Sequence, residues 1–478
     1  MSFRPQRIRD PLHNVIEFPP TQFEDVMWRV IQTRPFQRLR RIKQLGFSEL
    51  VYPGATHTRF IHSVGVYHTA RILHHRIRRL QADSSYLEAQ AHTALAAALV
   101  HDVGHGPFSH AFEEVGKRLK LKMARHEDVS DELIRHGDIA EVLNDLHSGF
   151  SNDVADLIGS TGPRDIFAAI VSSQFDADRL DYMRRDRLMC GTQHGAIDFD
   201  WLLSNIEIGS VAVGVDNLKA SDVETFVLGP KAIYAAESYL TGLFQLYPTV
   251  YFHKTTRCAE KLFTELLCRV FELVVDSSVR KTGLPVNHPL VQFARRHQSI
   301  DAALKLDDFV VWGALELMAA AKDPQISGIS RRLRDRRLLR AIELFDDRIL
   351  AQAWRVSEPK LFLDAIERHL RNALKSTASK KTADGVPRVL FDRVSRSPYK
   401  EFDQTKGPLN QILIRDRDRN LVDVKNLSPV VRAIKEFEGL RAYVSRDDQK
   451  IQSILQDAVA KGVKYAKSKT YKSKKHRA

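Results

Sequence analysis

Histidine is concentrated in one stretch of this 478-residue chain, and imidazole is the side chain best suited to both metal binding and proton transfer near neutral pH. Twelve of the 19 histidines lie between His57 and His147. The densest segment, residues 101–110, reads His-Asp-Val-Gly-His-Gly-Pro-Phe-Ser-His. This uneven distribution indicates a functional site within the first third of the chain.

The adjacent pair His101 and Asp102 offers an imidazole nitrogen and a carboxylate oxygen, which are donors for Fe, Mn, Zn or, through the carboxylate, Mg. On a regular helix neighbouring side chains diverge by about 100°. At a helix end, however, Gly104 and Gly106 permit a tight turn that can bring both donors to one ion. His-Asp pairs are common by chance, so the residues that flank this pair must show whether it belongs to a metal site.

His62 is one such flanking residue, since it lies near the start of a helix expected over residues 60–80. A histidine there, opposite a second buried helix, can supply another ligand. Taken alone, His62 fits a hydrogen-bonded core histidine better than a metal ligand.

Carboxylates are dense in a second flanking segment, residues 175–186. Asp178 and Asp186 share one helix face with Tyr182, because they lie four residues apart in series, and stacked carboxylates repel unless cations are present. Asp178 is therefore a candidate ligand. For Asp176 and Asp181 we expect ordinary surface ion pairs with the neighbouring arginines.

Two imidazoles and two carboxylates together predict an open metal site, from His62, His101, Asp102 and Asp178. No cysteine takes part, so water or substrate can fill the remaining positions, and such a site suits hydrolysis of a phosphate ester. The expected cofactor is one divalent metal, with Mn, Mg, Fe and Zn all open. Other nearby groups could act as acids or bases or hold phosphate. They are His105, His110, Glu113, His126 and Glu127 for the first role, and Arg40 and Arg59 for the second.

Helices must position these residues. Apolar spacing predicts an amphipathic helix over residues 60–80 and an alanine-rich helix, buried all round, over 84–100, which ends at His101. Alternating segments at 206–213 and 225–228 predict a small β-hairpin. Short strands are expected at 388–394, 410–414 and 440–445. The predicted fold class is therefore mainly α, with a helical core, the hairpin and a small C-terminal α/β lobe.

The pattern along the chain divides it into four predicted regions. They are a catalytic helical domain over 1–280, a helical extension over 281–375, the α/β lobe over 376–450 and a basic, disordered tail over 451–478. Residues 461–478 hold eight lysines and arginines and no acid, so the other 460 residues carry only +6 of the net charge of +14. A solvated end is the favoured interpretation of this tail, and weak nucleic-acid binding is the alternative.

Composition excludes several classes of protein. The chain is 43% hydrophobic and 28% charged, which excludes a mainly disordered protein. No apolar run approaches the roughly 20 residues of a membrane span, and the N-terminus does not resemble a secretory signal. Three cysteines cannot form a disulfide framework. We therefore expect a cytoplasmic protein without a membrane partner.

Several sequence blocks, in order, resemble the HD-domain phosphohydrolases, and among them the deoxynucleoside triphosphate triphosphohydrolases that include the vertebrate enzyme with a sterile alpha motif. No sterile alpha motif is expected here. The blocks are Arg9-Asp-Pro-Leu-His-Asn14, Phe36-Gln-Arg-Leu-Arg-Arg-Ile-Lys-Gln-Leu-Gly46, Tyr52-Pro-Gly-Ala-Thr-His-Thr-Arg-Phe-Ile-His-Ser-Val-Gly-Val66, His101 to His110, Arg125-His-Glu127 and Asp176-Ala-Asp-Arg-Leu-Asp-Tyr182. The resemblance is strong over about residues 5–190 and implies an HD-domain helical core.

The resemblance also implies a role for each matching residue. The metal ligands would be His62, His101, Asp102 and Asp178, and the groups acting on phosphate would be His110 and His126, supported by His105 and Glu113. Arg59 and Arg179 would hold the triphosphate, with Tyr182 and Asp186 near phosphate and sugar, and Gln44, Leu45 and Tyr251 would face the deoxyribose. Arg40 stays a candidate phosphate contact on its charge alone. The implied reaction converts a dNTP and water into a deoxynucleoside and triphosphate.

Two positions depart from the family pattern. Leu243 stands where the vertebrate relative has a phosphate-contacting arginine, and Gln32 stands where it has an acid that reads an activating nucleotide. Relatives of this size are homo-oligomers, and we expect the same here. Two alternatives remain open: an HD-domain nucleotidase or phosphodiesterase acting on another nucleotide, and a nucleic-acid-binding protein with a vestigial HD pocket.

Overall fold

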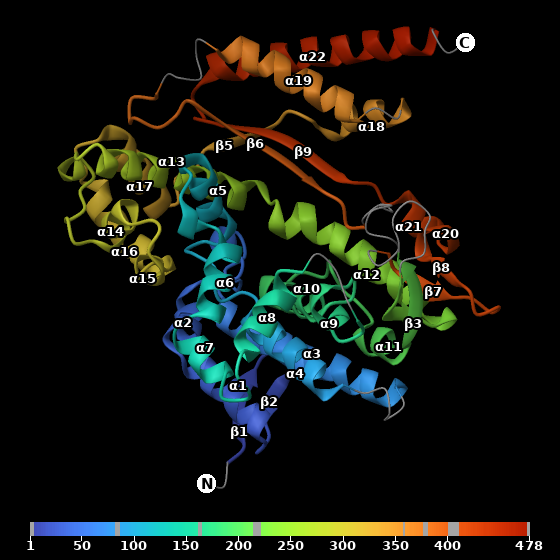
Figure 1. The fold of residues 1–478 in the computed structure, drawn as a ribbon. Coiled ribbons are helices and arrows are strands. Elements are labelled where there is room, and N and C mark those ends of the chain that lie inside the picture. The colour runs from blue at the N-terminus through green and yellow to red at the C-terminus, as the bar shows by residue number, and fades with distance from the viewer. Residues whose placement is uncertain are drawn as a thin grey trace. The chain divides into compact units, whose positions relative to one another are not determined.

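The computed structural model describes residues 4–81, 87–160, 165–213, 221–356, 359–375, 381–399 and 411–475. Helices dominate these residues, and the strands form small separate sheets (Figure 1). The predicted fold class, mainly α with a hairpin and small C-terminal strands, is confirmed. Among the described residues, no helix has the length and apolar character needed to cross a bilayer.

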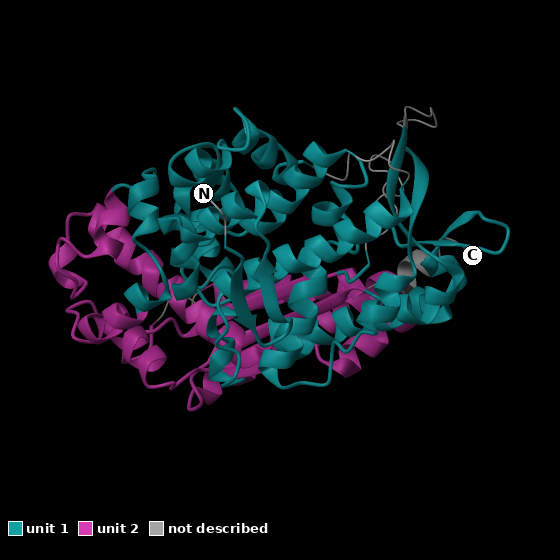
Figure 2. Ribbon diagram, turned by 90° about the horizontal axis from the view of Figure 1, so that it is seen from below, with its two compact units in different colours: residues 1–251, 296–311, 397–435 teal, residues 252–295, 312–396, 436–478 magenta. Residues whose placement is uncertain are grey.

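The chain divides into two compact units (Figure 2). Unit 1 comprises Met1–Tyr251, Arg296–Val311 and Ser397–Lys435, and unit 2 comprises Phe252–Arg295, Trp312–Arg396 and Glu436–Ala478. These units group the segments differently from the four predicted regions, because each later region contributes to a unit that also contains distant residues. The division into the four regions stays a prediction.

Unit 1 holds the histidine-rich segment within a set of packed helices. Its elements are β1 Gln6–Asp10, β2 Asn14–Phe18, α1 Gln22–Gln32, α2 Arg34–Arg38, α3 Arg59–Leu80, α4 Glu88–Val100, α5 His110–Leu119, α6 His126–Arg135, α7 Asp138–Leu143, α8 Phe150–Ile158, α9 Ala169–Ser172, α10 Ala177–Cys190, α11 Phe199–Ser204, β3 Ile206–Val213, β4 Ser221–Leu228, α12 Ile233–Leu246, α15 Ile300–Leu304, β7 Leu413–Arg415, β8 Leu421–Asp423, α20 Val424–Leu427 and α21 Pro429–Ala433.

Unit 2 combines helices with a three-stranded sheet. Its elements are α13 Lys254–Val275, α14 Pro289–Arg295, α17 Pro324–Arg334, β5 Arg340–Glu343, α18 Asp347–Arg355, α19 Pro359–Leu374, β6 Val389–Arg396, β9 Phe437–Val444 and α22 Gln449–Lys475. Helix α16, Asp308–Ala319, begins in the part of the chain assigned to unit 1 and continues in unit 2.

Helices α3, α4 and α10 form the core that carries the site. Helix α4 is alanine-rich and buried all round from Ala94 to Val100, but residues 88–90 are exposed, so the predicted all-round burial holds only for the C-terminal half. Helices α3 and α10 approach closely at Gly65, where a Cβ would overlap the side chains of Asp181 and Arg185. Only glycine fits there, so the sequence itself permits the close contact between these two helices.

The predicted β-hairpin is confirmed. Strands β3 and β4 pair in antiparallel fashion with Ile206 opposite Leu228, and the expected turn lies outside the described residues. The hairpin continues into β7 and β8, in the order β3-β4-β7-β8. The strands expected near the C-terminus therefore form, but they belong to two sheets, because β6 and β9 join β5 in unit 2.

The prediction of a disordered tail over 451–478 is wrong for the described part. Residues Gln449–Lys475 form helix α22, which lies along α19 (Figure 1). Its apolar side, including Ile451, Leu455 and Ala466, is buried in the core of unit 2. The lysines Lys461, Lys464, Lys467 and Lys469 are exposed. The tail thus combines a charged face with a packing face, as expected of an amphipathic helix.

Candidate metal centre and catalytic site

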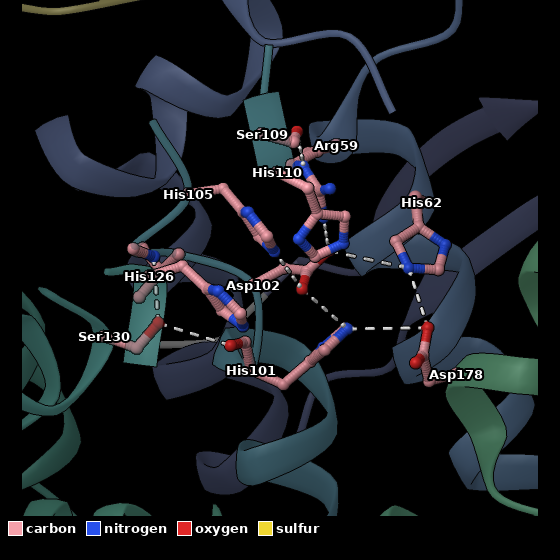
Figure 3. Close-up of polar contacts among 12 residues, drawn as sticks. Arg59, His62, His101, Asp102, His105, Ser109, His110, His126, Ser130 and Asp178 are labelled. Carbon is pink, nitrogen blue, oxygen red and sulfur yellow. Dashed lines mark hydrogen bonds and ion pairs between the residues drawn. The ribbon is translucent and has the colours of Figure 1, made fainter. Parts of the chain in front are cut away.

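Four side chains that are widely separated in the sequence meet in unit 1, and we call them the ligand cluster: His62 from α3, His101 and Asp102 just after α4, and Asp178 from the first turn of α10 (Figure 3). Nε2 of His62 lies 3.1 Å from Oδ1 of Asp178 and 3.8 Å from Oδ2 of Asp102. Nε2 of His101 lies 3.7 Å from the same Asp178 oxygen and 3.4 Å from Oδ1 of Asp102. The predicted set of four is therefore brought together.

The second nitrogen of each imidazole is already engaged. Nδ1 of His62 lies 3.0 Å from Oδ2 of Asp181, and Nδ1 of His101 lies 3.0 Å from the carbonyl oxygen of Ala98. Both partners are acceptors, so each Nδ1 donates its proton to them. A ring protonated at Nδ1 carries its lone pair on Nε2, and this arrangement is typical of metal-binding histidines.

The surroundings of the two Nε2 atoms indicate whether a metal ion fits between them. Both are buried and make no hydrogen bond within the part of the chain that the structure describes, although carboxylate oxygens face them. Each Nε2 can carry a proton or give its lone pair to a metal ion at this position, and either cation offsets the negative charge of the facing carboxylates. Asp178 keeps 41% of its side chain exposed while His62 is fully buried, so water or substrate can approach on the Asp178 side. The donors fit one divalent metal with an open side.

The electrostatics of the ligand cluster favour positive charge. Burial lowers the pKa of His62, but its interactions with the carboxylates of Asp178 and Asp181 outweigh burial and raise this pKa to about 10. Burial likewise raises the pKa of Asp102, but Arg59 and His101 hold it well below its usual range. The pocket therefore stabilises a cation at the position that these groups surround.

Asp181 corrects one sequence prediction. It was expected to form a surface ion pair, but the structure places it fully buried behind His62. Its carboxylate accepts hydrogen bonds from Arg185 at 2.7 and 2.9 Å and contacts Nε2 of His13 at 2.8 Å. Arg185 also donates to Asp10 at 2.8 Å. This buried network orients His62, and sequence reasoning missed it because its members come from β1, α3 and α10.

A second group of polar side chains lies beside the first, and we call it the relay cluster: His105, His110, Glu113 and His126. Glu113 contacts Nδ1 of His126 closely, and its other oxygen lies 3.3 Å from Nδ1 of His110. Burial raises the pKa of Glu113, but its bonds to the two histidines lower it below the usual value. Glu113 is therefore a carboxylate that can stabilise a protonated imidazole on either side.

The geometry of the relay cluster suits proton transfer better than metal binding. The rings of His105 and His126 stack with centroids 4.0 Å apart and an angle of 9° between planes. Ring nitrogen lone pairs lie in the ring plane, so those of stacked rings run side by side and do not converge, although one ligand atom each of His105, Glu113 and His126 lies within 4.8 Å of the others. Burial and Arg59 also hold the pKa of His105 well below its usual value, so this ring stays neutral.

Comparisons with known proteins place these residues in an HD domain. The family model for the HD domain matches residues 59–183, which contain both clusters, and the model for the HD associated region matches residues 215–283. YwfO of Bacillus subtilis, an uncharacterised protein, is 32% identical over 340 residues, which are 70% of this chain and 71% of the relative. The crystal structure of a phosphohydrolase from Bacteroides thetaiotaomicron superposes with a TM-score of 0.69 and 25% identity, covering 93% of this chain and all of that one. The chain belongs to the HD-domain phosphohydrolases.

One named relative carries more information about activity. The mouse deoxynucleoside triphosphate triphosphohydrolase SAMHD1 is 28% identical over 361 residues, which are 68% of this chain and 52% of the mouse protein. This HD-domain chain thus matches about half of the length of the mouse enzyme.

Arg59 of the HD domain, predicted to hold phosphate, instead makes its hydrogen bonds to other side chains of the protein. It is buried, its guanidinium contacts Asp102 closely, and its Nε donates to Oγ of Ser109 at 2.9 Å (Figure 3). Arg179 donates to the carbonyl oxygen of Ser173 at 2.6 Å and pairs with Asp176 at 3.2 Å. Its side chain is 24% exposed, so Arg179 remains the more accessible of the two arginines.

The remaining predicted substrate contacts form two groups. Asp186 is buried and interacts with Nε2 of His57 and the hydroxyl of Tyr251, each at 2.9 Å, and the Tyr251 ring lies beside Tyr182. In the second group, Oε1 of Gln44 is buried without a hydrogen-bond partner among the described residues, Leu45 is half-buried, and Arg40 is exposed over the ring of Phe60. His57 was not predicted, although it belongs to the same block as Arg59 and His62.

Proposed function

We propose that this chain is a metal-dependent dNTP triphosphohydrolase, which converts a dNTP and water into a deoxynucleoside and triphosphate. The observation that carries the proposal is the ligand cluster, in which two Nε2 lone pairs and two carboxylates surround one position. The choice of dNTP as substrate rests on the mouse relative, whose name states that activity, and on the residue blocks shared with that family.

The ligand cluster would hold the metal, with Mn, Mg, Fe and Zn as candidates. A bound divalent ion supplies a Lewis acid that polarises a phosphoryl oxygen and lowers the pKa of water. His62 and His101 each present Nε2, because Asp181 and the Ala98 carbonyl hold their Nδ1 protons. The exposed side of Asp178 leaves room for the triphosphate.

The relay cluster would handle the proton. Hydrolysis at the α-phosphate breaks the bond between phosphorus and the 5′-oxygen, and that oxygen must gain a proton as the deoxynucleoside leaves. His110 and His126 each turn Nδ1 toward Glu113, which leaves Nε2 of each ring to hold or deliver a proton. The His110 side chain is 74% exposed, so it can meet a substrate that enters from solvent.

Substrate contacts follow from the same placement. Arg179 and Tyr182, both partly exposed on α10, would face the triphosphate. Gln44, with its unpartnered amide oxygen, and Tyr251 would face the sugar. Assembly into a homo-oligomer, cytoplasmic localisation and weak nucleic-acid binding by the basic face of α22 stay predictions. Gln32 argues against activation of the vertebrate kind, and Leu243 argues for a different phosphate contact.

A product-resolved assay tests the proposal. Metal-free protein is supplied with Mn²⁺ or Mg²⁺ and each of four dNTPs and four NTPs, and the products are separated by ion-exchange chromatography. The expected products are deoxynucleoside and triphosphate, from dNTPs in preference to NTPs. A monophosphate with pyrophosphate, or turnover only of another nucleotide class, would contradict the proposal and favour a different HD-domain nucleotidase.

A further inference from the structure

Asp308 is a buried carboxylate that ties together two segments of the site. It is the first residue of α16 and is 1% exposed. Its Oδ1 accepts the backbone N–H of Phe108 at 2.7 Å, and its Oδ2 accepts the backbone N–H of Lys43 at 2.9 Å. A single side chain therefore fixes both the loop before α5 and the segment that leads into Gln44 and Leu45.

The loop that Asp308 holds has an unfavourable backbone conformation. Phe108 and Ser109 both have φ of 53°, in the left-handed region that residues with a side chain rarely adopt. Such a conformation persists only where the surroundings enforce it. Here the enforcing contacts are the Asp308 bond to Phe108 and the stacking of Phe108 on Phe47, with centroids 4.0 Å apart.

This conformation places groups that reach the ligand cluster. Oγ of Ser109 accepts a hydrogen bond from Nε of Arg59 at 2.9 Å, and Arg59 in turn contacts Asp102. His110 of the relay cluster follows directly as the first residue of α5. A change at Asp308 is therefore transmitted through Ser109 and Arg59 to Asp102.

A second buried residue supports the same connection. Arg38 donates to the carbonyl oxygen of Leu306 at 2.9 Å and to those of Val103 and His105 at 3.2 and 2.7 Å. The segment before Asp308 is thus bound to the turn between Asp102 and His105. Two independent contacts join residues 306–308 to the loop that carries both clusters.

We propose that Asp308 is a positioning residue for the metal centre and the relay cluster, acting through the Phe108–Ser109 backbone and Arg59. Its catalytic consequence rests on the proposed function, but its effect on metal binding does not. Asp308 touches neither cluster itself, so it would alter the site without removing any ligand.

The test compares Asp308→Asn with Asp307→Asn. An asparagine keeps the size but has one acceptor oxygen, so it can satisfy only one of the two N–H groups and turns its own NH₂ toward the other. Asp307 is an equally buried neighbour that instead binds Arg41 and caps Val310. Isothermal titration of Mn²⁺ into metal-free protein, thermal unfolding, and kcat and KM for dNTP hydrolysis are measured for both.

Asp308→Asn is expected to weaken Mn²⁺ binding about tenfold or more and to lower kcat within the roughly 10–100-fold range typical of residues that orient ligands. Asp307→Asn should remain within about twofold of wild type in both measurements, even if its melting temperature falls. A lower melting temperature for Asp308→Asn with unchanged Mn²⁺ affinity would show a purely structural role and overturn the proposal.

If Asp308→Asn does not fold, Ser109→Gly replaces it. Glycine adopts a positive φ without strain, so this variant removes only the hydroxyl that Arg59 contacts. Weaker Mn²⁺ binding by Ser109→Gly supports the proposal, and wild-type affinity overturns it. If the wild-type chain releases no triphosphate, the proposed function fails, while the Mn²⁺ titrations still decide the role of Asp308.

Discussion

The ligand cluster and the relay cluster both combine histidines with carboxylates but differ in what faces each imidazole. In the ligand cluster, Nδ1 of His62 and of His101 is held by an acceptor, and Nε2 is buried and unpartnered among the described residues. In the relay cluster, Glu113 takes Nδ1 of His126 and of His110, and His110 is exposed. Partners and ring orientation, rather than residue type, distinguish the proposed metal site from the proposed proton-transfer site.

We expect the largest effect on the ligand cluster from a substitution at His101. His101→Ala removes one of two imidazole ligands, so we expect Mn²⁺ binding to be lost and dNTP hydrolysis to fall by about three orders of magnitude or more. Titration of Mn²⁺ and the product-resolved assay measure the two effects.

The matched control for this change is His92→Ala, in helix α4, which ends directly before His101. His92 stacks on Phe23 at 4.0 Å and belongs to neither cluster. It should keep Mn²⁺ affinity and turnover close to wild type. Full-strength Mn²⁺ binding by His101→Ala would contradict the assignment of the ligand cluster.

Glu113→Gln sharpens the comparison from the other side. Glutamine keeps the shape but removes the negative charge that stabilises a protonated His110 or His126, so kcat should fall by about two orders of magnitude. Mn²⁺ affinity should stay within about twofold, because Glu113 is not a ligand. Glu114→Gln, the next residue on α5, is the control. A large loss of Mn²⁺ affinity in Glu113→Gln would mean that the two clusters act as one metal site.

Asp181→Asn tests how the ligand cluster is supported. The amide cannot accept all the bonds from Arg185 and His13 while holding Nδ1 of His62, so we expect Mn²⁺ affinity to fall about tenfold. Asp392→Asn is the control, since Asp392 is equally buried and paired with Arg257 but lies outside both clusters. Both variants should lose stability, and only Asp181→Asn should lose affinity. Equal Mn²⁺ affinities would reduce the buried network to a structural role.

Much of the site could be predicted from sequence, because its ligands lie in local motifs. His101 and Asp102 are adjacent, and the β-hairpin has a clear alternation of apolar residues. Asp181 shows the limit. An aspartate and an arginine four residues apart have the same spacing on a surface and in a core. Contacts from distant residues, including Asp10 and His13, distinguish the two cases, and the sequence does not reveal them. Asp308, 200 positions from Phe108, has no local signal at all.

Helix α22 in the basic tail was not predicted, although the sequence contains the apolar spacing of a helix. Ile451, Leu455, Ala458, Ala466 and Thr470 recur at helical spacing and are buried in α22. The prediction of disorder rested on the excess of lysine and did not take this apolar spacing into account. Charge alone therefore does not predict disorder when apolar residues keep a helical spacing.

The smallest expected effect concerns Gly65, where helices α3 and α10 pack closely beside the ligand cluster. Gly65→Ala places a methyl group against Asp181 and Arg185. These two side chains are buried and joined by two hydrogen bonds, so displacing them costs free energy. We expect a loss of about 1–3 kcal/mol in the free energy of unfolding and a few-fold loss of Mn²⁺ affinity. Gly313→Ala in α16 is the control, because a Cβ there meets open space and should stabilise the helix by about 0.5–1 kcal/mol. If Gly65→Ala matches Gly313→Ala in both denaturant unfolding and Mn²⁺ titration, the spacing of α3 and α10 does not set the geometry of the ligand cluster, and the orientation of His62 must come from the hydrogen bonds of Asp181 alone.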